Sequence, residues 1–404
     1  MRKSFKLVLV AIAFFSFVFC TDDNVSNGEG VAEAQLEVAT LADFSSNQET
    51  QTVNITANMY WFTEVDVNWV TLTPRFGTNN GSINVTVNAN PNAEMRTGTF
   101  TVIGGSLSNT IAIKQAAKTN NSGTLDPNKP PSQNFDLSTW KLNTPENNGS
   151  GFAKTISVSE MTNGYQNNNY FYTAADGGLV FKCPIAGFKT SANTSYTRVE
   201  LREMLRGTNT NISTQGVNKN NWVFGSAPAA DKLAAAGFDG EMDATLAVNY
   251  VTTTGSSGQV GRVIIGQIHA NDDEPVRLYY RKLPNIDLGS IYFAHEPRDG
   301  FGSEQWVEII GSRSNSAANP TDGIALNEKF SYKIKTVNNL LTVTISRDGK
   351  PDLTKTVDMS NSGYDVGGQY MYFKAGLYQG NNSGDANDYV QATFYELEKS
   401  HTVN

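Results

Sequence analysis

Three short segments in the second half of the chain carry polar side chains that a strand serving only stability would not need. They read YTRVELR, VIIGQIH and YMYFKAGLY and begin at residues 196, 263 and 370. Period-two alternation places their polar members on one face of each strand: Arg198, Glu200 and Arg202; Gln267 and His269; and Tyr372, Lys374 and Tyr378. Each segment alone is typical of a solvated sheet face, but together they supply cations, an amide, an imidazole and phenols. Cleavage of a uronic-acid polysaccharide by β-elimination requires this set of groups.

The chemistry of such an elimination assigns roles to four of these side chains. The C5 proton of a 4-linked uronate is too weakly acidic to remove unless the adjacent carboxylate is neutralised, and Arg198 and Gln267 can donate hydrogen bonds to that carboxylate. His269, neutral near physiological pH, is a suitable base for the proton. Tyr372 can pass its phenolic proton to the departing O4 oxygen. We therefore predict these four residues to be catalytic.

The elements that must position these residues are strands. Short runs rich in Val, Ile, Thr, Tyr and Phe are separated by clusters of Gly, Asn, Asp and Ser, and the clearest helix signal is the alanine-rich stretch from Ala229 to Ala236. The length of 404 residues exceeds what one hydrophobic core usually organises. A polar segment with three prolines and no apolar periodicity predicts a linker at 118–134, between a small β-sandwich at 34–117 and a larger all-β domain at 135–404.

The N-terminus has the architecture of a signal peptide. Residues 1–20 begin with basic side chains, continue through an apolar run that is too short to span a membrane, and end at Cys20. We therefore expect lipoprotein processing, with Cys20 lipidated and the lipid as the only membrane link, and a secreted protein of the bacterial outer membrane or cell surface. Cys183 then has no disulfide partner, and its strand position predicts a small buried side chain.

The net charge of −8 argues against nucleic acid as a partner. It does not argue against an acidic polysaccharide, because binding depends on the cations of one cleft and not on the overall charge. The run 272–274 (DDE) lacks the spacing of a hard-cation site and is expected to be an acidic loop. We predict no metal and no cofactor, and we expect a monomer.

The three polar segments resemble the signatures of polysaccharide lyase family 7, the alginate lyases: Arg-x-Glu-Leu-Arg, Gln-Ile-His and Tyr-Phe-Lys-Ala-Gly-x-Tyr, complete and in family order. The resemblance covers residues 135–398. It implies a β-jelly-roll (concanavalin-like) sandwich that cleaves alginate to products with a 4,5-unsaturated end. It also implies that Arg202, Lys374 and Tyr378 contact neighbouring sugars.

Within that family, the position of the C5 proton decides which residue removes it. The resemblance implies that Tyr372 is both base and acid on mannuronate, where the proton lies on the leaving-group side, and that His269 is the base on guluronate. Ile268 accompanies guluronate acceptance in the family more often than Val does, so we expect the enzyme to accept guluronate. We also expect endo attack. After Tyr378 this chain continues Gln379-Gly380, whereas the family commonly continues Asn-Gln, so we expect different substrate contacts there.

The first domain resembles the immunoglobulin-like BACON domain of bacterial surface enzymes. The resemblance covers most of residues 34–117 and includes the runs WVTLTP from Trp69, INVTV from Ile83 and a terminal IKQAA. Trp61 and Trp69 could stack on sugars, but tryptophan in a small sandwich is more often a core residue. The expected role is a spacer between the lipid anchor and the enzyme.

Two other functions compete with this interpretation. A jelly-roll glycoside hydrolase would need Glu-x-Asp-x-x-Glu, and Glu241-Met242-Asp243 begins that pattern, but Leu246 stands where the second glutamate is required. A non-catalytic polysaccharide-binding surface lipoprotein could use the same cations and aromatic rings without turnover. Binding alone would not need His269 and Tyr372 together, which favours the lyase.

Several polar positions outside the catalytic set also have expected roles. Glu200 fits equally the orientation of an arginine and an ordinary cross-strand pair. His295 is expected to pack within a sheet and His401 to lie in a C-terminal tail. The acidic loop 272–274 and the Asn- and Gly-rich stretch 379–387 are expected to form lids over the cleft.

Overall fold

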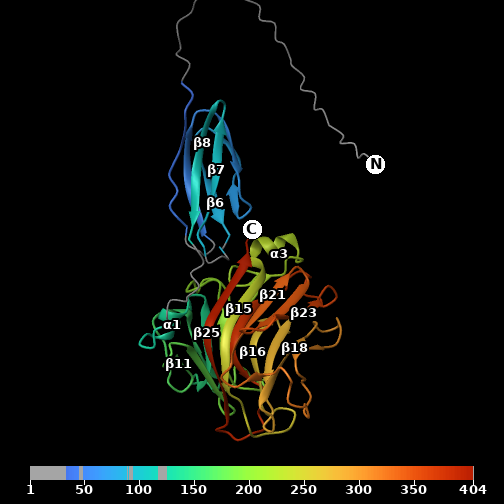
Figure 1. Ribbon diagram of the computed structural model, residues 1–404. Helices are drawn as coiled ribbons and strands as arrows, with labels where there is room; N and C mark the ends of the chain where they lie inside the picture. Colours follow the sequence, from blue (N-terminus) through green and yellow to red (C-terminus); the bar gives the residue numbers. More distant parts are fainter. Residues whose placement is uncertain (1–32, 45–48, 89, 91–93, 117–124, 404) are drawn as a thin grey trace, which may run out of the picture.

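The part of the chain that the structure describes alternates strands with turns, as shown by the computed structural model in Figure 1. The structure describes residues 33–44, 49–88, 90, 94–116 and 125–403. The predicted signal peptide, its lipidation site Cys20 and residues 118–124 of the predicted linker lie outside the described residues. In the described part of the chain, no helix has the length and hydrophobicity needed to cross a membrane.

The first domain consists of two antiparallel sheets of four strands each. In sheet order, one contains β1 (Leu36–Val38), β2 (Glu49–Ala57), β6 (Gly81–Val87) and β4 (Val70–Thr73), and the other contains β5 (Phe76–Thr78), β3 (Tyr60–Val65), β7 (Arg96–Gly104) and β8 (Leu107–Gln115). Alternate residues of β6 are buried, and their apolar side chains join one core with those of the other strands. The predicted immunoglobulin-like sandwich is therefore confirmed.

The two tryptophans of the first domain differ in exposure. Trp61 is 1% exposed in the core, and its indole nitrogen donates to the carbonyl of Asn79 at 2.8 Å. Trp69 is partly buried, with the guanidinium of Arg96 lying 4.2 Å from its ring centroid. Trp61 is closed to a sugar, and Arg96 covers one ring face of Trp69, which favours the interpretation that they serve packing.

The second domain is a sandwich of two larger sheets, as predicted. The nine-stranded sheet contains β10 (Ala153–Ile156), β9 (Trp140–Asn147), β13 (Arg198–Glu203), β24 (Tyr372–Gln379), β16 (Arg262–His269), β17 (Val276–Arg281), β18 (Leu288–His295) and β19 (Gln305–Ile310), with β20 (Ile324–Ala325) beside β18. The eight-stranded sheet contains β11 (Phe171–Thr173), β12 (Leu179–Pro184), β25 (Tyr389–Thr402), β15 (Gly237–Tyr250), β21 (Lys329–Val337), β22 (Leu340–Ser346) and β23 (Leu353–Asp358), with the short β14 (Trp222–Val223) beside β15.

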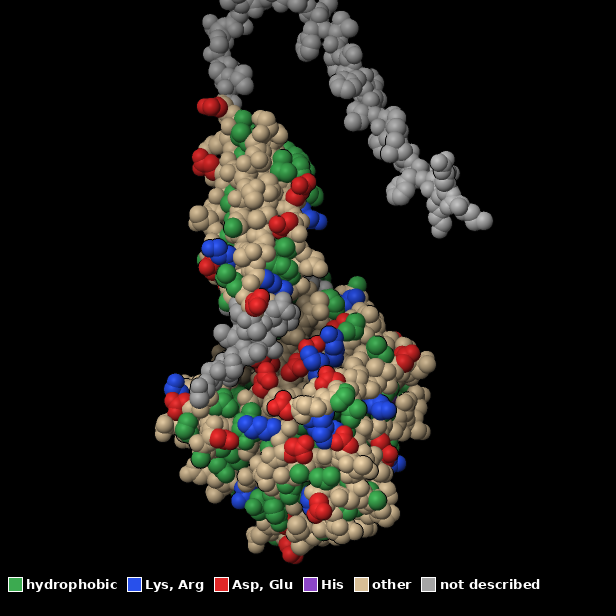
Figure 2. Space-filling view, in the orientation of Figure 1, with side chains coloured by type: hydrophobic (Ala, Val, Ile, Leu, Met, Phe, Trp, Pro, Cys, Tyr) green, Lys and Arg blue, Asp and Glu red, His purple; other side chains and the backbone are tan. Residues whose placement is uncertain are grey.

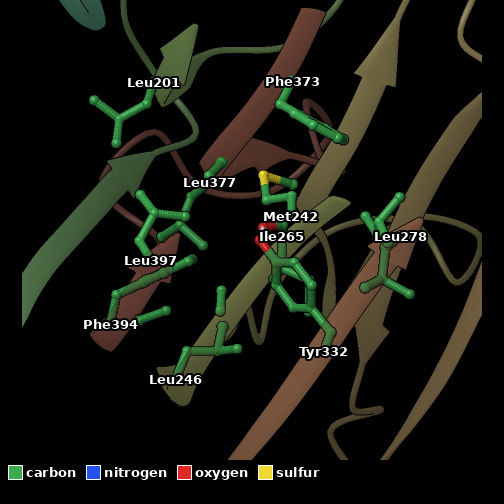
Figure 3. Close-up of a cluster of buried hydrophobic side chains, with 14 of the residues drawn as sticks. Leu201, Met242, Leu246, Ile265, Leu278, Tyr332, Phe373, Leu377, Phe394 and Leu397 are labelled. Atoms are coloured by element: carbon green, nitrogen blue, oxygen red, sulfur yellow. Dashed lines mark hydrogen bonds between the residues drawn. The ribbon is translucent and has the colours of Figure 1, made fainter. Parts of the chain in front are cut away.

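The hydrophobic core lies between these two sheets. Figure 3 shows Leu201, Phe373 and Leu377 of the nine-stranded sheet in the same cluster as Leu246 and Phe394 of the other sheet. Because strand side chains alternate between faces, burial of one set on the core leaves the other set of β13, β24 and β16 on the opposite face. That opposite face carries the predicted site.

Helices are few and short in the described chain: α1 (Pro131–Asn134), α2 (Val158–Thr162) and α3 (Ala229–Ala234). The helix predicted from the alanine-rich stretch is thus present as α3. At α2, Ser157 and Glu160 form a capping box, which explains why so short a helix is stable there.

The end of the predicted linker is attached to the second domain. Leu125 packs against its core, and the side chain of Asn134 donates to the carbonyls of Asp126 and Gly177 at 2.9 and 3.3 Å. Residues 125–134 therefore form an ordered strap on the sandwich. The sequence did not predict this attachment, because it depends on one leucine and on side-chain hydrogen bonds and not on an apolar pattern.

Cys183 is buried and unpaired, as expected. Burial raises the pKa of its thiol to about 12, so the thiol stays protonated and unreactive. Acidic and basic side chains are interspersed on the face of the second domain that Figure 2 shows.

Candidate active site

All eight polar residues of the three predicted segments lie on one face of three adjacent strands, β13, β24 and β16. Arg198 lies opposite Tyr378, and Arg202 lies opposite Lys374 in the register of β13 with β24. In the register of β16 with β24, Gln267 lies opposite Lys374. The last such pair is His269 with Tyr372. The sequence separations are large, so the sheet topology alone brings these groups together.

Glu200 is the centre of a buried charge network. Its carboxylate is 2% exposed and contacts Arg198 Nη1 at 2.9 Å and Lys374 Nζ at 2.5 Å. It also accepts a hydrogen bond from the side-chain amide of Gln267. Burial acts to raise the pKa of Glu200, but Lys374 and Arg198 outweigh this effect and the pKa is lowered, so the carboxylate is ionised. Of the two roles considered for Glu200, the structure supports orientation of Arg198, shared with Lys374.

Two groups in this network have hydrogen-bonding capacity left. Arg198 Nε and Gln267 Oε1 are buried and have no partner among the described residues. The amide nitrogen of Gln267 carries two hydrogens, of which one is donated to Glu200. A carboxylate placed between Arg198 and Gln267 would therefore find free donors from both side chains.

His269 and Tyr372 form a stacked pair next to this network. Their ring centroids are 4.9 Å apart with an interplanar angle of 11°. His269 Nδ1 lies 2.6 Å from the carbonyl oxygen of Ala270, which can only accept, so Nδ1 carries the proton and Nε2 has a free lone pair. Burial, with the nearby cation of Lys374, lowers the pKa of His269 to about 3. The imidazole is neutral at physiological pH.

Tyr372 is held by the arginine that the sequence assigned to sugar binding. The guanidinium of Arg202 lies 3.8 Å from the Tyr372 ring centroid, and its terminal nitrogens donate to the carbonyls of Glu203 and Thr214 at 3.0 and 2.7 Å. Burial raises the pKa of Tyr372 to about 12, although Arg202 opposes the rise. Tyr372 is therefore a protonated phenol, and the contacts of Arg202 place it as a support for that phenol.

The two remaining residues assigned to substrate binding also lie on this face. Lys374 is buried, and burial together with Arg198 lowers the pKa of its ammonium to about 8 despite the pairing with Glu200. Tyr378 is partly exposed, with the Arg198 guanidinium 3.9 Å from its ring centroid. Between them, Gly376 has φ 117°, and a Cβ there would lie 2.8 Å from the Val199 carbonyl oxygen. This explains the glycine of the Tyr-Phe-Lys-Ala-Gly segment.

Glu274 lies next to His269, although sequence reasoning placed it only in an acidic loop. The turn from β16 to β17 brings its Oε1 atom to 3.4 Å from His269 Nε2, and its Oε2 atom is 3.4 Å from Arg277 Nη1. Burial raises the pKa of Glu274 to about 7, and a hydrogen bond with Glu296 adds to the rise. A hairpin with paired residues Ile268 and Val276 is the signal that could have located it.

Two expectations about the surroundings of the site need correction. The segment 379–387 is not a free lid at its start, because Gln379 and Asn381 are fully buried and donate to the carbonyls of Cys183 and Thr254 at 3.1 and 2.7 Å. His401 does not lie in a tail. It belongs to β25, and its Nε2 atom lies 2.7 Å from the buried carboxylate of Glu203.

The structure separates the hydrolase-like carboxylates from this site. Glu241 and Asp243 flank Met242, which is buried in the core, so their side chains lie on the outer face of the eight-stranded sheet. There they pair with Lys333 and Lys335. His295, in contrast, is fully buried in β18, as expected of a packing residue. No group of three or more potential metal ligands occurs among the residues the structure describes.

The comparisons with known proteins fit this geometry. Residues 135–401 match the family model described as alginate lyase, and residues 59–116 match BACON, a putative N-terminal binding domain. A curated alginate lyase of Klebsiella pneumoniae is 57% identical over 279 residues, which cover 67% of this chain and 91% of that protein.

Solved structures extend the similarity to three dimensions. The crystal structure of the alginate lyase from Klebsiella pneumoniae aligns with a TM-score of 0.67 and 55% identity, covering 67% of this chain and 98% of that one. Alginate lyase A1-II', a member of polysaccharide lyase family 7, gives a TM-score of 0.50 at 28% identity, with coverage of 68% and 99%. A variant of that lyase was solved in complex with a substrate written GGMG, at 27% identity, a TM-score of 0.50 and coverage of 68% and 97%.

Proposed function

Because this chain belongs to the alginate lyase family, we propose that it cleaves the 4-linked uronate backbone of alginate by β-elimination on the outer face of the nine-stranded sheet. The observation that carries the proposal is that the stacked pair of His269 and Tyr372 shares one sheet face with the Arg198 and Gln267 donors. A base, an acid and a carboxylate-binding pair thus share one face of three strands. The solved complex of a related lyase with a substrate supports alginate as the ligand.

The first step is binding of the carboxylate of the uronate to be cleaved. Arg198 Nε and the second amide hydrogen of Gln267 donate to its oxygens, while Glu200 holds both side chains in place. As the C5 proton leaves, negative charge grows on this carboxylate. Donors fixed in advance by a buried network stabilise that charge without reorganising, which favours the transition state over the bound substrate.

The proton transfers follow from the protonation states of the stacked pair. On guluronate, His269 Nε2 takes the C5 proton, the C5–H electrons form the C4=C5 double bond, and the C4–O4 bond breaks. Tyr372 donates its phenolic proton to O4, which departs as a hydroxyl. Glu274, 3.4 Å from Nε2, stabilises the imidazolium that forms on His269. On mannuronate, the family resemblance gives both roles to Tyr372: as the phenolate, which Arg202 stabilises, it takes the C5 proton and returns that proton to O4.

The activity test is ultraviolet absorbance of the conjugated double bond, with the full chain acting on guluronate-rich and mannuronate-rich alginates in separate reactions. We expect absorbance to rise on both, and faster on guluronate. Tyr372→Phe removes the acid and should reduce turnover by roughly 10²–10⁴-fold while leaving substrate binding nearly intact. New reducing ends without absorbance would indicate a hydrolase, and binding without either signal would indicate a polysaccharide-binding protein.

We further propose an endo-acting enzyme, monomeric and attached to the bacterial surface through lipidated Cys20. Endo attack predicts a rapid fall in alginate viscosity relative to the number of double bonds formed, whereas exo attack predicts release of short products with little early change in viscosity. Lipidation predicts that Cys20→Ala abolishes incorporation of labelled fatty acid and releases the enzyme into the medium. Retention of the label on the variant would refute the anchor.

A further inference from the structure

The β9 side of the site carries three cations, and two of them, Lys141 and Arg206, have no role in the proposed reaction. Lys141 of β9 lies directly opposite Arg202 of β13. Its neighbour Leu142 is buried in the core, so Lys141 extends from the same face as the catalytic residues. Arg206 follows shortly after β13 and lies close enough to act on the charge of Lys141. We call Lys141, Arg202 and Arg206 the β9 cation cluster.

The β9 cation cluster has no carboxylate partner within the described chain. Arg202 donates to backbone carbonyls and to the side-chain oxygen of Asn221. Arg206 donates to the carbonyl of Ile212, and its Nε atom is buried without a partner. Lys141 takes part in no hydrogen bond or ion pair within the described residues. Arg198 and Lys374, in contrast, share Glu200.

Such an arrangement is unfavourable without an anion. Like charges directly opposite each other on a sheet repel, and a partly buried ammonium loses hydration. Burial and then the cations Arg202, Lys374 and Arg206 lower the pKa of Lys141 to about 8, in agreement with this view. An incoming carboxylate would offset both the repulsion and the lost hydration.

The β17 side of the same sheet face carries more negative than positive side chains. Glu274, Glu296 and Glu304 all pair with Arg277 of β17, so carboxylates exceed cations there. A polyanion that crosses the strands would be attracted toward β9 and repelled toward β17. The charge distribution therefore favours placing the rest of the sugar chain over the β9 side.

We propose that Lys141 and Arg206 bind the carboxylate of a second uronate residue, on the same chain as the residue that is cleaved. The proposal rests on the proposed function, since it extends the same binding face. Lys141, Arg202, Lys374 and Gln267 occupy one register row on four adjacent strands. Three strand spacings separate Lys141 from Gln267, roughly 14 Å, which is too far for two groups on one sugar.

The test compares three variants of the full chain on a length series of oligoguluronates. Lys141→Met removes the charge and should raise KM about tenfold, the value of one charge-assisted hydrogen bond, only for oligomers long enough to reach β9. Lys141→Arg keeps the charge and should restore most of the affinity. Lys355→Met is the matched control, because Lys355 is exposed on β23 of the other sheet.

Salt dependence separates binding from structural damage. If Lys141 neutralises a substrate carboxylate, KM of the Lys141→Met variant should increase less steeply with salt than KM of the parent protein. Thermal unfolding shows whether the variant is folded. Should Lys141→Met not fold, Arg206→Gln repeats the test from the other side of the cluster.

Two outcomes would overturn the proposal: equal KM values of Lys141→Met and Lys355→Met at every oligomer length, or an unchanged salt slope in a folded Lys141→Met protein. Calorimetric titration of the same oligomers keeps this proposal separate from the proposed function. If the parent protein binds long oligomers through Lys141 but never produces the double bond, the lyase proposal fails and the carboxylate site stands.

Discussion

Glu200 compensates the positive charges of the two buried cations at the centre of the site. Its carboxylate lies against Arg198 and Lys374, and both cations depend on it for charge compensation. Glu200→Gln should leave two buried positive charges uncompensated. We expect a loss of about 3–5 kcal/mol in the free energy of unfolding, typical of breaking a buried pair, together with a large loss of turnover. Urea unfolding and the double-bond assay measure the two effects.

Glu241→Gln is the matched control for this prediction. Glu241 also contacts two lysines, Lys333 and Lys335, but on the partly exposed outer face of the other sheet. Exposed ion pairs contribute at most about 1 kcal/mol, so this variant should keep its activity and nearly all of its stability. Equal destabilisation by the two substitutions would refute the central role of Glu200.

Glu274 provides a second prediction, in which activity and stability change in opposite directions. Its folded-state pKa of about 7 lies above the ordinary 4.5, so folding favours the protonated carboxyl. The stability that this preference contributes is complete below about pH 4.5 and is lost as the pH rises through about 7. Glutamine imitates the protonated form at every pH. Glu274→Gln should therefore be more stable than the parent by on the order of 1–3 kcal/mol above about pH 8, and equally stable near pH 4.5.

The same substitution should slow the enzyme, because the neutral amide cannot stabilise an imidazolium on His269. We expect guluronate cleavage to fall by about tenfold or more and mannuronate cleavage to fall less, since the proposed base for mannuronate is Tyr372. Unfolding curves at several pH values and rates on both substrates test the pair of effects. A variant that is less stable at high pH, or that slows both substrates equally, would contradict this role for Glu274.

Sequence patterns placed the predicted catalytic side chains on one sheet face but did not locate all of their neighbours. Alternation has a period of two, so it assigns Arg198, Gln267 and Tyr372 to one face of their strands without knowledge of the fold. Glu274 and Lys141 could not be found in this way. Glu274 reaches His269 around a turn, and Lys141 is recognised as part of the site only because it lies opposite Arg202 on the neighbouring strand. Such cross-strand relations depend on register, which the sequence of one strand does not contain.

At the scale of elements, a β-bulge explains why strict alternation of side chains does not hold along β16. The register of β16 shifts between Ile264 and Gly266, which lets Ile265 and Ile268 both face the core while Gln267 faces the site. The pairing of β25 with β15 also shifts, between Thr245 and Leu246. Beyond Leu397, the inward positions of β25 are the polar residues Lys399 and His401, which pair with the buried carboxylate of Glu203, so the end of the strand resembles a polar tail in the sequence. His401 was misplaced for that reason.

The end of β25 is part of the sandwich, and His401 should contribute to its stability. His401 lies 2.7 Å from Glu203 and packs against Trp222, with ring centroids 5.1 Å apart and an interplanar angle of 38°. Glu203 is fully buried and belongs to β13, so the contact joins the two sheets. His401→Gln should lower the free energy of unfolding by about 1–3 kcal/mol, because it weakens a hydrogen bond to a buried carboxylate. Thermal unfolding, with hydrogen exchange of the β25 amides, measures the loss.

Truncation after Thr402 provides the control, because it removes only the residues beyond β25. That chain should match the parent in melting temperature and in activity. Since His401 does not contact the reacting groups, His401→Gln should also turn over at a normal rate well below its melting temperature. A stable but inactive variant would show that the histidine acts on the site and would contradict a structural role.

At the scale of the whole molecule, two hydrophobic cores share no residue. One fills the small sandwich around Trp61, and the other fills the large one between the sheets that include β13 and β25. The composition and the strand pattern were sufficient to predict two all-β domains, because each hydrophobic run must be buried within its own sandwich. They could not predict the strap at 125–134, which side-chain hydrogen bonds attach.

Separate cores predict separate responses to mutation. Trp61 is 1% exposed, and Gly77 and Gly81 lie directly against its ring. Trp61→Ala should leave a large cavity and cost about 3–5 kcal/mol in the first domain alone. Calorimetry of the full chain should then show one transition moved to lower temperature and the other unchanged, with lyase activity intact. Phe181→Ala, in the second core, should move the other transition and reduce activity at elevated temperature. If either substitution shifted both transitions, the two cores would unfold as one unit, and the first domain would stabilise the enzyme and not serve only as its spacer.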